Sequence, residues 1–135
     1  LYLKKSQRME RYLIDSNAII DYLGNKIPGR SKNFMDKIID STPNISILSQ
    51  IEVLSFNTSD ENQIILKNFI FDSNIYELTN EVANNCIEIR KVHKTKLPDA
   101  IIASTAIANN MVLITRNKKD FEKINKLKII NPHSI

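Results

Sequence analysis

Apolar and polar residues follow two periods along the chain, one typical of strands and the other typical of helices. Short aliphatic or β-branched runs predict five strands, at residues 11–15, 44–48, 74–78, 111–115 and 127–130. The segments between them place apolar residues three or four positions apart, which predicts helices at 16–23, 31–40, 49–56, 60–71, 79–93, 98–110 and 120–125. Strands that alternate with helices along a whole chain indicate an α/β domain with a mainly parallel sheet, covered on both faces.

Several residues mark where the predicted helices begin and end. Gly24 ends the first helix, and Thr79 is placed to cap the helix that follows the third strand. Ser49 and Glu52 match the capping box S-x-x-E, so a helix is predicted to begin at Ser49. Pro98 suits the first turn of a helix, where its missing N–H costs no hydrogen bond.

The composition is that of an ordinary globular protein, with 42% hydrophobic and 25% charged residues. The 135 residues fit one domain, which we place at 9–133, with residues 1–8 as a tag or upstream extension. No apolar run reaches the roughly 18–20 residues that span a bilayer, and no secretory signal opens the chain. The single cysteine, Cys86, excludes an internal disulfide and is expected in the core. We therefore expect a cytoplasmic protein that does not associate with membranes.

Four acidic residues fall at one edge of the predicted sheet. Asp15 ends the first strand, Glu52 follows the second and Asp120 follows the fourth. Asp99 opens the helix that runs into the fourth strand, so it lies at the same edge. Open α/β folds build their ligand sites at this edge. Taken alone, each acid is also explained as a helix cap or as a charge at the positive end of a helix dipole.

Taken together, the four acids indicate a metal site, because like charges repel one another unless a cation lies between them. Carboxylates without His or Cys suit a hard cation such as Mg²⁺ or Mn²⁺. His93 and His133 lie away from the acids and are expected to be structural or exposed. The chain has no G-x-S-x-G sequence of a serine hydrolase and no nucleotide-binding glycine motif. It also has Asp-Ser-Asn at 15–17, where a phosphatase of this class would have D-x-D.

The order and spacing of these motifs resemble those of PIN-domain nucleases, and among them the VapC-type toxins of type II toxin–antitoxin systems. The resemblance rests on YLIDSNAIIDYL, on SILSQIEVLSF and on LPDAIIASTAIANNMVLITRNKKDFEKI. It covers nearly all of residues 9–133. It implies a three-layer α/β/α domain with a mainly parallel central sheet.

The resemblance also implies which residues form the site. Asp15, Glu52 and Asp99 would bind the divalent ion, and Asn117 or Asp120 would complete the site directly or through water. Family members differ in which of the last two positions carries the acid. Three neighbouring polar residues are expected to support the site: Ser16, Asn17 and Thr115.

The activity that the resemblance implies is Mg²⁺- or Mn²⁺-dependent endonucleolytic hydrolysis of RNA, which leaves a 5′-phosphate and a 3′-hydroxyl. The chain carries a formal charge of +4, part of it in basic runs beside the acids. These runs supply five candidate RNA contacts, which are equally explained as solvated surface: Lys94, Lys96, Arg116, Lys118 and Lys119. The implied partners are tRNA or ribosomal RNA, a cognate antitoxin and a second copy of the chain. Helices at 31–40 and 60–71 are the candidate dimer surface, because they carry more apolar residues than one covered face needs: Phe34, Met35, Phe69 and Phe71.

Two other functions fit the same sequence. One is a PIN nuclease of RNA processing or decay, although such enzymes often carry added zinc or RNA-binding segments. The other is a PIN module that binds without catalysis, for which the loss of one acid would be the expected mark. The three principal acids are all present.

Overall fold

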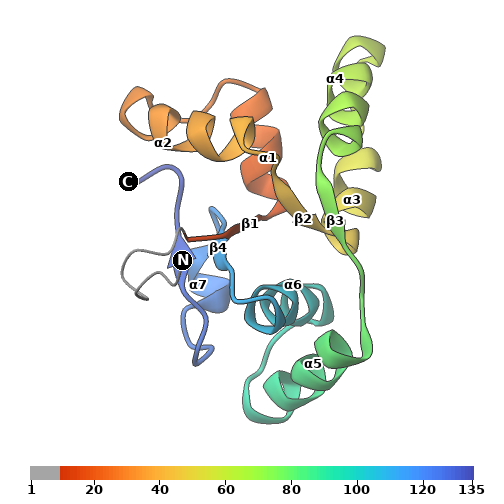
Figure 1. Ribbon diagram of the computed structural model, residues 1–135, viewed down its shortest axis with the longest axis vertical. Helices are drawn as coiled ribbons and strands as arrows, with labels where there is room; N and C mark the ends of the chain where they lie inside the picture. The colour runs from red at the N-terminus through yellow and green to blue at the C-terminus, as the bar shows by residue number, and fades with distance from the viewer. Residues whose placement is uncertain (1–9) are drawn as a thin grey trace, which may run out of the picture.

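A five-stranded sheet lies between two layers of helices in the computed structural model, which describes residues 10–135 (Figure 1). Every pair of neighbouring strands is parallel, in the order β3-β2-β1-β4-β5. The strands are β1 (Tyr12–Ile14), β2 (Asn44–Ser46), β3 (Asn74–Tyr76), β4 (Val112–Ile114) and β5 (Ile129–Ile130). The predicted three-layer α/β/α fold is confirmed, and its sheet is parallel throughout the described residues.

The helices occupy the segments between the strands, as predicted, with bounds that differ by a few residues. They are α1 (Ser16–Leu23), α2 (Gly29–Asp40), α3 (Ile47–Leu54), α4 (Asp60–Phe71), α5 (Asn80–Val92), α6 (Leu97–Ala108) and α7 (Lys118–Phe121). Within residues 10–135, no helix is both long and apolar enough to cross a membrane. The prediction that residues 1–8 are a tag or upstream extension concerns residues outside the described range.

The junction between β2 and α3 corrects the sequence analysis. The predicted strand at 44–48 ends at Ser46, and the helix begins at Ile47 instead of Ser49. Ser46 is the N-cap, because its hydroxyl oxygen accepts a hydrogen bond from the Ser49 N–H at 3.0 Å. The two serines are equally suited to capping, and the apolar Ile47-Leu48 pair fits a strand as well as a helix. Glu52 therefore lies in the second turn of α3 and belongs to no capping box.

Alternate residues of the central strands pack into two separate cores. Leu13 and Leu113 are fully buried against α5, α6 and α7, whereas Ile14 and Ile114 are fully buried against α1, α2 and α4. This division follows from the two-residue period of a strand, and each such side chain stabilises the fold by about 1.5–3 kcal/mol. Cys86 is buried in the first of these cores, as predicted.

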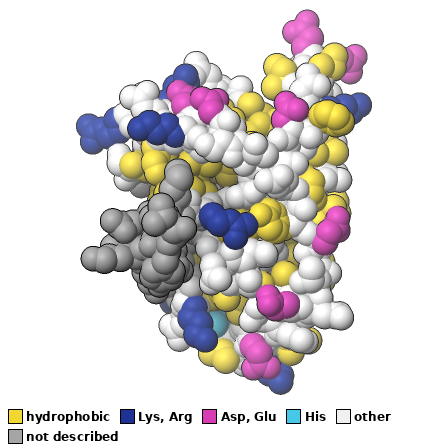
Figure 2. All heavy atoms as spheres, viewed as in Figure 1, with side chains coloured by type: hydrophobic (Ala, Val, Ile, Leu, Met, Phe, Trp, Pro, Cys, Tyr) yellow, Lys and Arg dark blue, Asp and Glu magenta, His cyan; other side chains and the backbone are white. Residues whose placement is uncertain are grey.

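The four apolar residues predicted to form a dimer surface on α2 and α4 are mostly part of the core. Met35 is fully buried and Phe69 is 8% exposed, so both belong to the core. Phe34 is partly buried against the same core, which leaves only Phe71 of the four predicted residues as a surface side chain, 88% exposed. Figure 2 shows hydrophobic side chains on the outer surface of α4, which also carries exposed Ile64 and Ile65.

The strand order places the ends of β1 and β4 side by side at the centre of the sheet. From β1 the chain moves outward through β2 and β3, and it then crosses to β4 and β5 on the other side of β1. Ile14 pairs with Ile114, so the residues that follow these two strands emerge together. Open α/β sheets bind ligands at such a point, where the direction of winding changes.

Candidate active site

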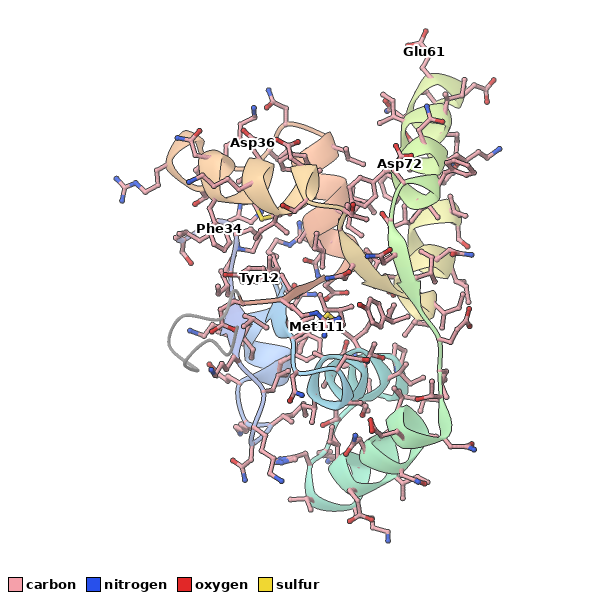
Figure 3. All side chains as sticks on the ribbon, in the orientation of Figure 1. Tyr12, Phe34, Asp36, Glu61, Asp72 and Met111 are labelled. Atoms are coloured by element: carbon pink, nitrogen blue, oxygen red, sulfur yellow. The ribbon has the colours of Figure 1, made fainter. Side chains whose placement is uncertain are left out.

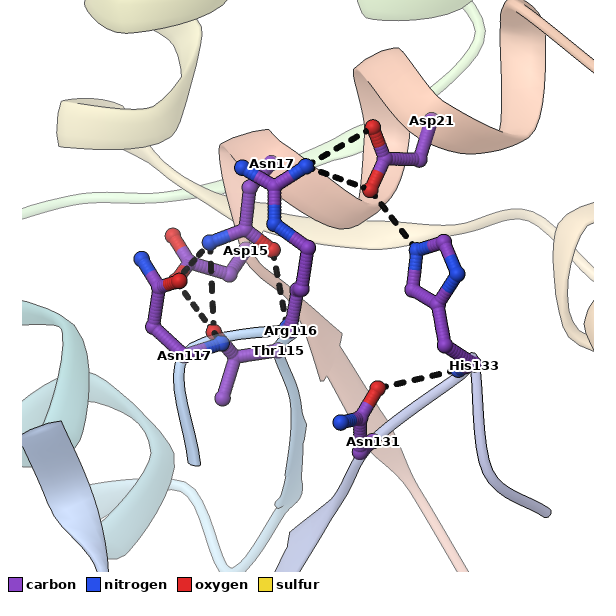
Figure 4. A network of polar contacts seen from close by, with 8 residues as sticks. All are labelled: Asp15, Asn17, Asp21, Thr115, Arg116, Asn117, Asn131 and His133. Carbon is purple, nitrogen blue, oxygen red and sulfur yellow. Dashed lines mark hydrogen bonds and ion pairs between the residues drawn. The ribbon is translucent and has the colours of Figure 1, made fainter. Parts of the chain in front are cut away.

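Asp15 follows β1 at this point, and within residues 10–135 three hydrogen bonds hold its carboxylate. Figure 4 shows the two that come from Asn17 and Thr115. Its Oδ1 accepts from the backbone N–H of Ser16 at 2.8 Å, which makes Asp15 the N-cap of α1. Its Oδ2 accepts from the Thr115 hydroxyl at 2.9 Å and from the Asn17 side-chain amide at 3.2 Å. Residues from the ends of β1 and β4 thus fix one carboxylate in one orientation.

Burial raises the pKa of Asp15, because a side chain that is only 6% exposed loses the hydration of its charged form. The hydrogen bonds from Thr115, Ser16 and Asn17 oppose this increase, and the negative charge of Glu52 adds to it. The Asp15 carboxylate is therefore well oriented but electrostatically unfavourable, and a nearby cation would stabilise it.

Glu52 reaches the same region from α3. Its Oε1 accepts a hydrogen bond from the Ser16 hydroxyl at 3.1 Å. Ser16 therefore connects the two acids, with its backbone N–H bound to Asp15 and its side chain bound to Glu52. The Glu52 side chain is exposed, so its carboxylate can reorient toward a ligand in the space in front of Asp15.

Asp99 approaches from the other layer of helices. It is the third residue of α6 and follows Pro98, which lies in the first turn as predicted. Burial raises the pKa of Asp99, and the charges of Asp120 and then Asp15 raise it further, against the opposing charge of Lys96. Asp99 thus lies within electrostatic reach of an acid from the β1 end and of another from α7.

The loop between β4 and α7 brings Asn117 and Asp120 toward the site. The Thr115 hydroxyl oxygen accepts from the Asn117 backbone N–H at 3.1 Å while its own hydrogen is donated to Asp15. Asn117 is the residue before α7, and within residues 10–135 its side chain makes no capping hydrogen bond. The predicted helix at 120–125 is displaced, since α7 begins at Lys118 and contains Asp120.

The sequence profile of the PIN domain matches residues 12–127. The chain belongs to the PIN-domain family. A chain of a toxin–antitoxin complex from Klebsiella pneumoniae is 28% identical, with a TM-score of 0.71, and the match covers 92% of this chain and 99% of that one. No match was found among the curated proteins.

Two further solved structures resemble this PIN domain. A chain of VapBC2 from Rickettsia felis, bound to a DNA fragment from its promoter, is 25% identical with a TM-score of 0.70, over 89% of this chain and 97% of that one. A chain of DNA-bound VapBC from Salmonella typhimurium is 22% identical with a TM-score of 0.75, over 92% of this chain and 99% of that one. The Salmonella chain, at its lower identity, supports the fold alone.

The acidic side chains that the structure describes in this PIN domain have the donor atoms that a divalent metal ion prefers, but they do not converge on one point. The four acids supply only hard oxygen donors. Burial raises the pKa of both Asp15 and Asp99, and the charges of neighbouring carboxylates add to the increase. Within residues 10–135, no three His, Cys, Asp or Glu side chains converge closely enough to hold an ion as they stand. Binding would therefore require exposed Glu52 and Asp120 to turn toward Asp15 and Asp99.

The basic residues predicted beside the acids of the PIN domain fall into two groups. Four are exposed lysines on the flanking segments: Lys94, Lys96, Lys118 and Lys119. Arg116 differs from them, because its guanidinium contacts the carboxylate of Asp21 through Nη1 at 2.9 and 3.1 Å.

Neither the ion pairs of Asp21 nor the partner of His133 was predicted from the sequence. Asp21 is 4% exposed, and its Oδ2 lies 2.8 Å from Nε2 of His133, so His133 is a structural residue, as expected. The signal in the sequence was a single charge inside the apolar run IIDYL, which a buried partner must offset. The identity of that partner, far along the chain, could not be read from the sequence.

Proposed function

We propose that this PIN domain is a Mg²⁺- or Mn²⁺-dependent endoribonuclease and the toxin of a toxin–antitoxin pair. The observation that carries the proposal is the grouping of acids at the switch point of the sheet. Burial raises the pKa of Asp15 and of Asp99; the charge of Glu52 adds to the increase at Asp15, and the charges of Asp120 and Asp15 add to it at Asp99. Carboxylates that lie close enough for their charges to repel are suited to share a cation. The 28% identity to a chain of a toxin–antitoxin complex supports the toxin assignment.

In this proposal, Asp15, Glu52 and Asp99 hold the metal ion, and Asn117 or Asp120 completes its ligands. A bound Mg²⁺ or Mn²⁺ would orient a water molecule, lower its pKa and neutralise charge on the phosphate. Thr115 and Asn17 keep Asp15 in its orientation through their hydrogen bonds. The hydroxyl of Ser16 donates to Glu52, so Ser16 connects the second carboxylate to Asp15.

The substrate in this proposal is an RNA phosphodiester, and the products carry a 5′-phosphate and a 3′-hydroxyl. A site with four carboxylates repels phosphate, so basic side chains at its edge are needed to hold the strand. The exposed lysines beside Asp99 and Asp120 are suited to this role. A tRNA or ribosomal RNA substrate, a cognate antitoxin and a homodimer belong to the same proposal.

The test is cleavage of total RNA by the wild-type protein and by Asp99→Asn, with Mg²⁺ or Mn²⁺ and again with EDTA. We expect the wild type to cut only with metal, and Asp99→Asn to lose the activity, because it removes one charged ligand without changing shape. Asp72→Asn is the matched control. Figure 3 shows Asp72 at the end of α4, where it is exposed and distant from β1 and α6.

Each outcome of this test discriminates between the functions considered. Cleavage that is lost with EDTA and in Asp99→Asn but kept in Asp72→Asn supports the nuclease. Equal cleavage by the wild type and Asp99→Asn would assign the activity to a contaminant. Binding of RNA without cleavage would favour a non-catalytic PIN module. Growth arrest on expression of the wild type, but not of Asp99→Asn, would distinguish a toxin from a nuclease of RNA processing.

A further inference from the structure

The β4–α7 loop is attached to α1 at two points by Arg116. The backbone N–H of Arg116 donates to the Asn17 side-chain carbonyl at 2.9 Å. One turn further along α1, Asp21 accepts two hydrogen bonds from Nη1 of Arg116 at 3.1 and 2.9 Å. Asn17 also donates a hydrogen bond to Asp15, so a single residue, Asn17, connects the backbone of Arg116 to the site.

The carboxylate that holds Arg116 is itself held on its other side. His133, from the segment after β5, lies with Nε2 2.8 Å from Oδ2 of Asp21 (Figure 4). The Asn131 side chain accepts from the His133 backbone N–H at 2.9 Å and fixes that segment. Because Asp21 is buried and bound on two sides, it is a rigid anchor for the guanidinium.

The anchored guanidinium keeps part of its hydrogen-bonding capacity for another partner. The Arg116 side chain is 52% exposed. Among residues 10–135, all of its side-chain hydrogen bonds come from Nη1, and its other terminal nitrogen points away from Asp21 in Figure 4. A guanidinium presents five N–H donors in a fixed plane, so it can bind a carboxylate on one edge and a phosphate on another.

We propose that Asp21 and His133 position Arg116 so that the free edge of its guanidinium binds a phosphate of the nucleic acid strand beside the site. The inference rests on the proposed nuclease function. Arg116 is then a substrate contact, whereas Asp21 and His133 act through it as positioning residues. Among residues 10–135, none of the four exposed lysines forms an ion pair of this kind, so they supply charge without fixed direction.

The test measures binding without cleavage, by fluorescence anisotropy of a labelled, mixed-sequence single-stranded RNA in EDTA. Arg116→Ala is expected to weaken binding about tenfold, because it removes hydrogen bonds to a charged group. Arg116→Lys is expected to restore little, since lysine cannot bind Asp21 and a phosphate in one plane. Arg30→Ala is the charge-matched control on α2, with an expected change below about twofold.

A double-mutant cycle separates positioning from general stability. Asp21→Asn is expected to weaken RNA binding nearly as much as Arg116→Ala, and the double variant is expected to be no weaker than Arg116→Ala alone. The dependence of log K on log salt is expected to become shallower by about 0.7 in all three, as for one lost phosphate contact on a single strand. Should Asp21→Asn fold poorly, His133→Gln, which keeps a donor group near Asp21, is expected to retain at least half of the wild-type affinity, and His133→Ala to lose more.

Three results would overturn the inference. They are wild-type binding by Arg116→Ala, wild-type binding by Asp21→Asn while Arg116→Ala is weak, and additive losses in the double variant. These results are distinct from failure of the proposed function, in which the wild-type protein itself would neither bind nor cut RNA. If the wild type cuts RNA and Arg116→Ala binds it normally, only the assignment of Arg116 fails.

Discussion

The hydroxyl of Thr115 should stabilise the folded protein through the charge of Asp15. Thr115 is fully buried, and it donates to Asp15 while accepting from Asn117 and, at 3.3 Å, from Asn17. Thr115→Val replaces this hydroxyl with a methyl group of similar size and leaves the backbone of β4 unchanged. The substitution therefore removes hydrogen bonds without opening a cavity.

The magnitude follows from the kind of bonds that are lost. A hydrogen bond to an ionised group contributes about 1.5–3 kcal/mol net to stability. The Asn117 N–H belongs to an exposed residue and can bind water instead, so its loss adds little. We expect Thr115→Val to lower the free energy of unfolding by about 2 kcal/mol at neutral pH. In urea this corresponds to a midpoint about 1 M lower.

The loss should depend on pH in a direction fixed by Asp15. Burial raises the pKa of Asp15 above its ordinary value of 3.8, and the Thr115 bond opposes the increase. The free energy of unfolding therefore decreases as pH rises from the ordinary pKa through the raised pKa of folded Asp15. The decrease is larger without the Thr115 hydroxyl, because the pKa of Asp15 is then raised further. Urea unfolding in EDTA should show a larger loss for Thr115→Val at pH 7 than at a pH near the ordinary value of 3.8, where the raised pKa of Asp15 favours its protonated form.

Thr115→Ser provides the control, because it keeps the hydroxyl and removes only a methyl group. Its cost should be about 1 kcal/mol and should not change with pH. Equal stability of Thr115→Val and the wild type at pH 7 would refute the reasoning. A loss of the same size at both pH values would show that the effect is one of packing and does not pass through Asp15.

Two further predictions concern the metal and the surface of α4. Mg²⁺ or Mn²⁺ at about 100 times its dissociation constant should stabilise the wild type by about 2.7 kcal/mol, and it should stabilise Asp99→Asn by less. Calorimetry measures this effect, and no stabilisation of the wild type would contradict the metal site. Phe69→Ala should cost about 3–5 kcal/mol because Phe69 is 8% exposed, whereas Phe71→Ala should change stability by less than about 0.5 kcal/mol because Phe71 is 88% exposed. Chemical denaturation compares these variants, and similar losses in both would contradict the placement of α4.

The order of strands and helices could be predicted because burial imposes a period on the sequence. Leu13 and Ile14, or Leu113 and Ile114, are each buried on opposite faces, and such unbroken apolar runs are typical of a strand covered on both sides. Helix bounds depend on single hydrogen bonds, which the pattern of apolar residues does not determine. The choice between Ser46 and Ser49 as N-cap changed the turn of α3 on which Glu52 lies.

Residues of the candidate site were predictable where the ends of strands, or the helix start that precedes a strand, place them. Asp15 and Thr115 follow paired strands, so their proximity follows from the parallel topology. The contacts of Asp21 depend on the path of the segment after β5, which brings His133 back over α1. No local pattern determines that path, because it results from the packing of the completed sheet.

Asp15 and Asp21 are both buried on the unit formed by β1 and α1, but they have different hydrogen-bond partners. This difference determines which of the two negative charges is available to a ligand. Asp21 is paired with Arg116 and His133, so little of its charge remains for a ligand. Within the described part of the chain, residues 10–135, Asp15 is held by neutral donors alone, from Ser16, Thr115 and Asn17. Neutral donors fix the orientation of a carboxylate but leave its negative charge uncompensated. A cation at the switch point would therefore be attracted to Asp15 and not to Asp21, even though both are buried on the same unit.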